Sequence, residues 1–288
     1  MQGAAGAVSF VVALVGVRVL LSRFARFALD QPNERSLHER PVPRTGGIAV
    51  LAGTATALAF GTSGLWLPLL LALGLAGLSF ADDLRSIPVA VRLCVHVGAA
   101  ALLVWYALPH LELWQGAALV LAIGWLTNLY NFMDGSDGLA GGMSVIGFAA
   151  YAVAATLAGT PALATLCVAI AAASAAFLVF NFHPARIFLG DVGSIPLGFL
   201  AGALGVVGWR DGVWPLWFPL AVFAPFIADA TLTLARRLAR RERVWQAHRD
   251  HYYQRMVRGG LGHRGTACVA YAVMIVCAGI GLAVLTRP

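Results

Sequence analysis

Long apolar segments alternate along the chain with short polar segments. A helix needs about 20 apolar residues to cross a bilayer core of roughly 30 Å. The pattern therefore predicts ten membrane-spanning helices, at about residues 5–22, 46–62, 64–81, 90–108, 115–130, 142–159, 161–180, 192–209, 213–233 and 266–286. The segments are continuously apolar and do not alternate as barrel strands do. The predicted fold is an all-α polytopic membrane protein in which residues 1–288 form one domain.

Composition excludes the other broad classes. Hydrophobic residues make up 60% of the 288 residues and charged residues only 11%, against about 25% charged residues in soluble domains. Disorder requires low hydrophobicity and high net charge. The cysteines lie in apolar segments without the paired spacing of a zinc site or a disulfide framework, so we expect free thiols.

The arginines predict the orientation. With ten spans, one side of the membrane carries the loops at about residues 23–45, 82–92, 128–142, 181–191 and 234–265. All 20 basic residues are Arg, and all but Arg210 and Arg287 fall on that side. Because cytoplasmic loops collect basic residues, we expect this side to be cytoplasmic and both termini to be periplasmic. The net charge of +7 then reflects topology, and no nucleic-acid partner is expected.

The acidic residues gather on the same predicted side. Asp82 and Asp83 follow a long apolar segment, where ionised carboxylates are costly and usually functional. Adjacent carboxylates suit a divalent cation such as Mg²⁺, which binds one or two carboxylates together with substrate phosphate oxygens. A solvated helix end is the alternative interpretation of this pair.

A second polar run occupies residues 128–142. Asn128 and Asn131 are three residues apart, as are Asp134 and Asp137, so a helix would bring these side chains near one face. The glycine after each aspartate permits close approach of the backbone to a ligand. A calcium loop is a competing interpretation, but the run lacks the terminal Glu of that motif.

The remaining candidates follow later in the chain. Phe188 is a candidate to stack on a nucleobase or to anchor at the membrane interface, and Asp191 is a candidate metal ligand at a helix start that favours phosphate. His251 lies in an Arg-rich segment and is a candidate to bind phosphate. Metal-binding acids, glycines, arginines and an aromatic ring together indicate phosphoryl transfer from a nucleotide-linked donor to a lipid.

These motifs resemble one known family, the polyprenyl-phosphate N-acetylhexosamine-1-phosphate transferases. The resemblance runs from about His38 to His251 and rests on the run from Asn128 to Ala140, on Asp82-Asp83, and on residues 43–47, 181–185 and 188–194. It implies a helical fold of ten or eleven spans in the bacterial inner membrane. The implied Mg²⁺-dependent reaction (Mn²⁺ is an alternative) joins undecaprenyl phosphate to the β-phosphorus of a UDP-N-acetyl sugar and releases UMP.

The resemblance also implies residue roles. Asp191 and Asp83 would bind the metal, Asp82 would deprotonate the lipid phosphate, and Asp134 and Asp137 would lie near metal and nucleotide. The implied catalytic set is completed by His251. The implied substrate-binding residues are Arg44, Asn128, Asn131, Asn181 and Phe188, with Asn181 and Phe188 at the uridine. Arg249 and Arg255 are candidates to supply substrate-binding charge in place of the histidines that the family carries in its last cytoplasmic loop. We expect direct attack by the lipid phosphate, because two polyanions bridged by Mg²⁺ need no protein nucleophile.

One segment departs from the family pattern. Many members carry H-x-H-H in the last cytoplasmic loop, whereas only the first His is present here, in His251-Tyr252-Tyr253-Gln254. This favours the branch that initiates O-antigen (lipopolysaccharide) or a similar surface glycan from UDP-GlcNAc or a modified N-acetylamino sugar. Phospho-N-acetylmuramoyl-pentapeptide transfer is the alternative within the family.

Two further alternatives belong to other classes. A transporter would place its acids near the bilayer midplane, often between inverted repeats, whereas here they are predicted at one interface. A catalytically inactive lipid-binding relative would not need the full set of acids. A homodimer formed through small residues is also compatible with the sequence.

Overall fold

The computed structural model describes residues 1–24, 28–32, 37–38, 40–243, 246 and 248–287. Within these ranges the regular secondary structure is helical apart from one short antiparallel pair of strands. The elements are α1 (Gln2–Arg23), β1 (Leu29–Asp30), β2 (Val42–Pro43), α2 (Gly46–Ala55), η1 (Thr56–Phe60), α3 (Trp66–Arg85), α4 (Val89–Ala107), α5 (Leu113–Met133), α6 (Leu139–Leu157), α7 (Pro161–Asn181), α8 (Asp191–Arg210), α9 (Trp217–Val222), α10 (Ala224–Ala239), α11 (Tyr252–Met256), η2 (Val257–Leu261) and α12 (Gly262–Leu285).

The described residues contain eight helices that are long and apolar enough to cross a membrane. They are α1, α3, α4, α5, α6, α7, α8 and the continuous segment from α11 to α12. This confirms the all-α polytopic prediction.

The other two predicted spans have a different form. Residues 46–62 form the short helix α2 and the 3₁₀ turn η1, which ends at Gly61 with φ +76°. Residues 213–233 are divided between α9 and α10. Pro225 lies in the first turn of α10. Because proline has no N–H and disfavours a helical residue before it, the apolar segment breaks there.

The helices extend further into the polar segments than hydropathy predicts. The predicted loop 82–92 is helical except for residues 86–88, and the predicted loop 128–142 is helical except for residues 134–138. Polar side chains in the last turn of a spanning helix can reach the interface, so they need not end the helix. Parts of the predicted loops 23–45 and 234–265 lie outside the described residues.

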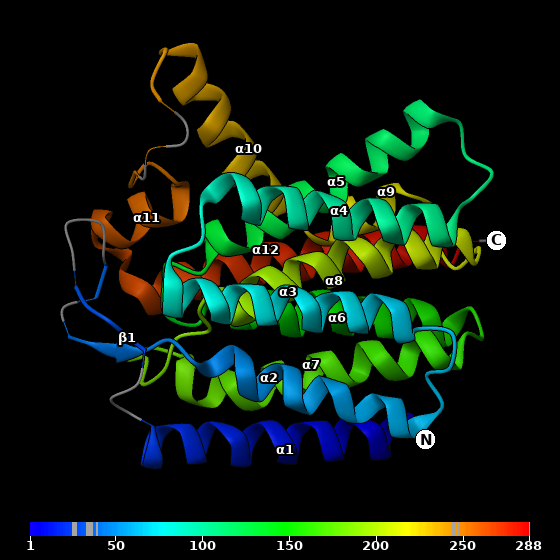
Figure 1. The fold of residues 1–288 in the computed structure, drawn as a ribbon, viewed down its shortest axis with the longest axis horizontal. Helices are drawn as coiled ribbons and strands as arrows, with labels where there is room; N and C mark the ends of the chain where they lie inside the picture. Colours follow the sequence, from blue (N-terminus) through cyan, green and yellow to red (C-terminus); the bar gives the residue numbers. More distant parts are fainter. Residues whose placement is uncertain (25–27, 33–36, 39, 244–245, 247, 288) are drawn as a thin grey trace.

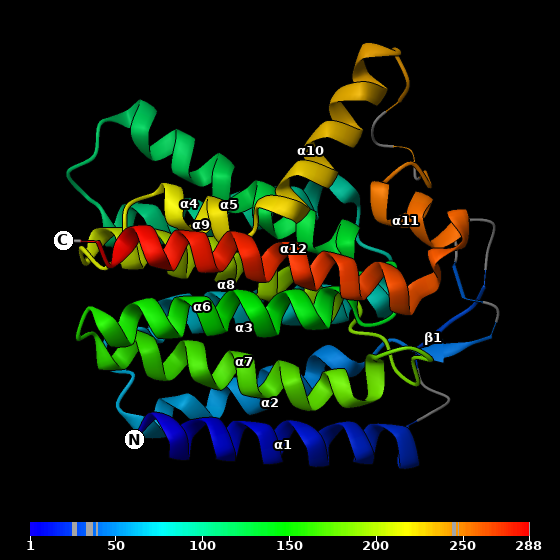
Figure 2. The same ribbon diagram turned by 180° about the vertical axis from the view of Figure 1, so that it is seen from behind.

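The helices run between two ends of the molecule (Figures 1 and 2). Both termini lie at one end, and β1 and α11 lie at the other. α8 is almost wholly buried and packs against α3 and α5, while α7 packs against α1 and α6. α10 projects away from the other helices beside α11.

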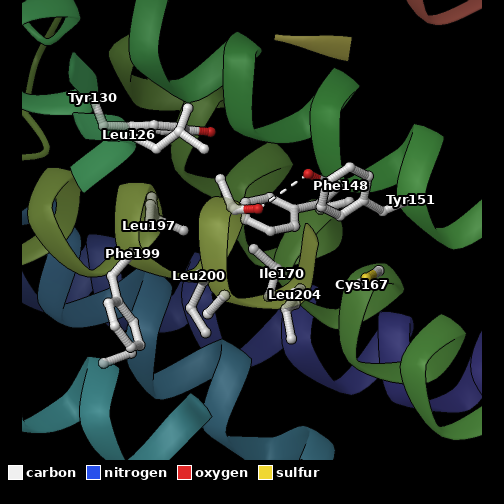
Figure 3. Packing of buried hydrophobic residues seen from close by; sticks show 14 of the residues in the cluster. Leu126, Tyr130, Phe148, Tyr151, Cys167, Ile170, Leu197, Phe199, Leu200 and Leu204 are labelled. Atoms are coloured by element: carbon white, nitrogen blue, oxygen red, sulfur yellow. Dashed lines mark hydrogen bonds between the residues drawn. The ribbon is translucent and has the colours of Figure 1, made fainter. Parts of the chain in front are cut away.

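The core is built from aromatic and aliphatic side chains of α5, α6, α7 and α8 (Figure 3). Tyr151 is fully buried, and its hydroxyl donates to the Ala201 carbonyl at 3.0 Å. The outer surface is also apolar, as the exposed side chains of Trp105, Leu113 and Trp114 illustrate. Large apolar side chains exposed over the length of the helices are stable facing lipid, so the protein is a multi-pass membrane protein.

Candidate active site

Four aspartates converge at the end of the molecule opposite the termini. Asp82 and Asp83 lie in the last turn of α3, Asp134 follows α5, and Asp191 begins α8. We call these residues the acid cluster. Contacts through Arg92, Arg44 and Gly190 bring its members together from elements far apart in sequence, and their catalytic and metal-binding roles stay predictions.

Arg92 of α4 joins two members of the acid cluster. Its Nη1 lies 2.5 Å from Asp82 Oδ2 and 3.7 Å from Asp191 Oδ2. The other oxygen of Asp82 accepts the Ile87 N–H at 2.6 Å. Both oxygens of the predicted base are thus bonded within the protein. Arg92 was not among the site residues predicted from the sequence.

Arg44 pairs with Asp83 at 2.8 Å, which places this predicted binding residue at the acid cluster. The backbone after Arg44 is fixed to the segment before Asp191. Gly46 and Gly47 donate their N–H groups to the carbonyls of Phe188 and Leu189, both at 2.9 Å. The start of α2 therefore holds Arg44 against the acid cluster.

Asp134 is half-buried and accepts the Gly190 N–H at 3.1 Å. Burial raises the pKa of Asp134 well above its usual range, and the negative charge of Asp191 raises it further. The side chain of Asn131, in the last turn of α5, lies beside the Asp191 carboxylate. Asp134 and the predicted binding residue Asn131 thus both adjoin Asp191.

Asp137 belongs to a different group of side chains. Its Oδ2 lies 2.6 Å from His183 Nδ1 and accepts the Ala185 N–H at 3.1 Å, and its Oδ1 lies 3.7 Å from His263 Nδ1. The two imidazole rings are stacked with centroids 5.2 Å apart. The expectation that Asp134 and Asp137 share one face is wrong, because residues 134–138 form a turn between helices. His183 and His263 were not singled out from the sequence.

The amides of Asn128 and Asn181 are engaged within the protein. Asn128 donates to the Gly124 carbonyl of its own helix at 2.7 Å. Asn181 is 3% exposed, accepts the Gly138 N–H at 3.0 Å and donates to the Ile187 carbonyl at 2.9 Å. Asn181 thus fixes two loops of the site to each other, and its contact with uridine stays a prediction.

Phe188 is half-buried, and its ring meets that of His38 edge to face with centroids 4.9 Å apart. This pair comes from segments about 150 residues apart in the chain. Stacking of Phe188 on a nucleobase stays a prediction.

His251 is buried at the start of α11, and its Nδ1 lies 3.1 Å from Asp229 Oδ1. Asp229 also accepts the N–H groups of Tyr252 and Tyr253, each at 2.9 Å. His251 therefore fixes α11 to α10, and its catalytic role stays a prediction. Arg255 lies over the Tyr252 ring, 5.8 Å from the centroid. The binding roles of Arg255 and Arg249 also stay predictions.

Membrane-spanning helices whose ends bring aspartates and arginines together are suited to hold phosphate-bearing substrates at the membrane interface. The chain belongs to glycosyl transferase family 4, whose model matches residues 65–209. The resemblance to polyprenyl-phosphate N-acetylhexosamine-1-phosphate transferases is confirmed.

Several relatives extend over most of the chain. A probable undecaprenyl-phosphate N-acetylglucosaminyl 1-phosphate transferase of Bacillus subtilis is 30% identical over 92% of this chain and 81% of its own length. A decaprenyl-phosphate N-acetylglucosaminephosphotransferase of Mycobacterium tuberculosis is 27% identical over 94% of this chain and 79% of its own length. A phospho-N-acetylmuramoyl-pentapeptide-transferase of Moorella thermoacetica is 33% identical but matches only 59% of this chain and 52% of its own length.

Proposed function

We propose that this protein transfers N-acetylglucosamine 1-phosphate from UDP-N-acetylglucosamine to undecaprenyl phosphate. The observation that carries the proposal is the acid cluster with its two arginines at the polar end of a membrane helix bundle. The relatives that extend over most of the chain are named for transfer of this sugar phosphate to polyprenyl phosphates, which supports this donor and acceptor.

An apolar groove beside α10 suits the polyprenyl chain. Its volume is about 380 Å³. It is lined by Leu139, Pro225, Phe226, Ala228, Asp229, Leu232, Tyr252, Tyr253, Met256, Thr266, Val269, Ala270 and Val273. Tyr253, which lines the groove, donates from its hydroxyl to the Phe132 carbonyl at 3.0 Å, two residues before Asp134. One wall of the groove therefore adjoins the segment that carries Asp134, which supports entry of the polyprenyl chain along this groove.

The acid cluster fits Mg²⁺, with Mn²⁺ as a substitute. No set of three His, Cys, Asp or Glu side chains among the described residues is arranged to hold a metal by itself. Mg²⁺ commonly uses one or two carboxylates and completes its shell with water and substrate phosphates. Asp191 and Asp83 would hold the ion, which neutralises charge on the diphosphate when bound.

In the proposed reaction, an oxygen of undecaprenyl phosphate attacks the β-phosphorus of the donor. A new phosphorus–oxygen bond forms, the bond from the β-phosphorus to the bridging oxygen breaks, and UMP leaves with that electron pair. Arg44 and Arg92 offset the negative charge of the two substrates. Asp82 is bonded to Arg92 and Ile87, which supports direct attack by the lipid phosphate over attack by this carboxylate.

We further propose that the site faces the cytoplasm from the bacterial inner membrane and that the product starts a surface polysaccharide such as O-antigen. The arginine distribution supports this orientation.

The test is a donor panel with the purified full chain. UMP release is measured with undecaprenyl phosphate and UDP-N-acetylglucosamine, UDP-glucose or UDP-N-acetylmuramoyl-pentapeptide, with Mg²⁺, with Mn²⁺ and with a chelator. We expect release only with UDP-N-acetylglucosamine and a divalent cation. Release with the pentapeptide donor alone would assign the protein to the other branch, and no release with any donor would reject the proposal.

Asp191→Asn tests the metal assignment. Because the amide cannot replace the charge of a metal-binding carboxylate, we expect turnover to fall by about 10³-fold or more and not to recover at higher Mg²⁺. Asp211→Asn, at the opposite end of α8 and bonded to Arg210, is the matched control and should retain wild-type turnover. Near-normal turnover of Asp191→Asn at limiting Mg²⁺ would exclude Asp191 as a metal ligand.

A further inference from the structure

A second cavity lies along α10, outside the acid cluster. Its volume is about 390 Å³. We call it the arginine cavity, and it is lined by Thr233, Arg236, Arg237, Arg240, Asp250 and Arg255. The lining carries four guanidinium groups and one carboxylate, and none of these residues belongs to the acid cluster. The surplus positive charge makes the cavity attractive to an anion.

One arginine is neutralised and holds the cavity together. Arg237 pairs with Asp250 and, at 3.1 Å, with Glu242, and its side chain is only 11% exposed. Through these pairs Arg237 ties α10 to the segment that precedes α11. The surplus charge therefore comes from the other three arginines.

Two of those arginines are oriented by one aromatic ring. The guanidinium carbons of Arg236 and Arg255 lie 5.0 Å and 5.8 Å from the centroid of Tyr252. Within the described part of the chain, Arg236, Arg240 and Arg255 form no ion pair with a carboxylate. Like charges held near one another repel, and a phosphate group among them relieves the repulsion and accepts their hydrogen bonds.

The surroundings of the cavity favour a lipid as the source of that phosphate. α10 projects from the other helices (Figures 1 and 2). Leu232 and Leu238 are 50% and 66% exposed on the same helix as the arginines. A helix that exposes both leucines and arginines is typical of the membrane interface, where basic groups meet anionic headgroups. The acceptor's own phosphate has to meet the donor at the acid cluster under the proposed function.

We propose that the arginine cavity binds the phosphate group of an anionic membrane phospholipid. This site lies outside the acid cluster, and in it Arg255, which the sequence suggested as a substrate-binding residue, binds the phospholipid instead. The proposal rests on the membrane placement of α10 and not on the transfer reaction.

The test compares phospholipids retained by the full chain. The protein is reconstituted in nanodiscs of mixed phosphatidylcholine and phosphatidylglycerol, and native mass spectrometry measures the ratio of the two lipids that stay bound after extraction. We expect wild type to enrich phosphatidylglycerol and Arg236→Gln/Arg240→Gln to lower the enrichment about tenfold or more. Arg18→Gln/Arg23→Gln, which removes two exposed charges from α1, is the matched control and should keep the wild-type ratio.

Two further measurements accompany this test. A charge-conserving variant controls for misfolding of the glutamine variant, and competition with soluble phosphates distinguishes a lipid from a nucleotide as the source of the bound phosphate. Arg236→Lys/Arg240→Lys keeps the charge and should retain part of the enrichment, because lysine lacks the fork of arginine. Inorganic phosphate and UDP should not displace phosphatidylglycerol from wild type. Displacement by UDP, together with weaker UDP binding by the glutamine variant, would instead assign the cavity to the donor and overturn the proposal.

Equal loss of enrichment in the α1 control would show that only net charge matters, and it would also overturn the proposal. A protein that releases no UMP in the donor panel but shows the expected lipid ratios would refute the proposed function and leave the phospholipid site standing.

Discussion

At the residue scale, Arg92 determines how the acid cluster is held together. One guanidinium nitrogen contacts carboxylates from α3 and α8, so the relative positions of Asp82 and Asp191 depend on this side chain. In the sequence, Arg92 follows Asp83 by only nine positions. The turn at residues 86–88 is very short, so the last turn of α3 and the first turn of α4 must be neighbours.

Arg92→Lys should lower turnover about 10–100-fold. Lysine keeps the positive charge, but its flexible and strongly hydrated ammonium group is less well oriented than the planar guanidinium, so Asp82 and Asp191 would be held together less firmly. UMP release at saturating donor measures the effect. Arg85→Lys is the control, because Arg85 is exposed at the end of α3. Equal losses in both variants would contradict the bridging role.

The environment of His248 makes the stability of the folded protein depend on pH. Burial lowers the pKa of His248, and the charge of Arg237 lowers it further. The Asp250 N–H donates to His248 Nδ1 at 3.3 Å, a bond that requires an unprotonated nitrogen. The facing groups are Arg237, His251, Asp250 and Glu242. Because the unfolded chain binds the proton more readily, stability falls as pH decreases below the ordinary value of 6.5.

Replacement of His248 by Gln should therefore flatten the decline in melting temperature between about pH 7 and pH 5. The decline reflects the uptake of at most about one proton by this side chain on unfolding, which the substitution removes. The measurement is thermal unfolding in detergent across this range. His110→Gln, at an exposed position between α4 and α5, should leave the wild-type slope unchanged. A slope that persists in His248→Gln would assign the effect to other groups.

At the element scale, the site depends on the close approach of α2 and α8. A Cβ atom on Gly47 would lie 2.3 Å from the backbone of Gly193, and one on Gly193 would lie 2.5 Å from Gly47. No side chain fits between these backbones, and the same contact holds Arg44 near Asp83. The G-G pair at residues 46–47 is thus a packing requirement of the site.

Gly47→Ala should destabilise the fold by about 1–3 kcal/mol, because the added methyl group forces the two helices apart. It should also reduce turnover, since Arg44 moves with the start of α2. Melting temperature and UMP release measure the two effects. Gly77→Ala is the control, because a Cβ there meets no atom within 4 Å, and it should stabilise α3 by up to about 1 kcal/mol.

The elements also show what sequence reasoning could and could not predict. Long apolar segments predicted eight spanning helices correctly, because length and hydropathy alone decide whether a helix can cross a bilayer. They did not predict the break before α10, although Pro225 is visible in the sequence. The partners of Asp137 were also missed, because His183 and His263 meet only after α7 and α12 pack beside the turn at residues 134–138.

At the scale of the whole molecule, the acids of the cluster lie at helix ends and not midway along the helices, and both termini lie at the opposite end (Figure 1). A transporter that couples to ions would place such acids near the bilayer midplane. The arrangement therefore favours chemistry at the interface, where a lipid phosphate and a water-soluble nucleotide sugar can meet.

This arrangement leads to a prediction about orientation. Nearly all arginines are predicted on the same side of the membrane as the acid cluster. Basic residues stay on the cytoplasmic side during insertion. Alkaline phosphatase fused after Pro288 should therefore be active, because it folds only outside the cytoplasm, whereas a fusion after Arg240 should be inactive. Green fluorescent protein at the same two positions should give the reverse pattern. Phosphatase activity at Arg240 with none at Pro288 would place the acid cluster outside the cell, where no cytoplasmic nucleotide sugar reaches it.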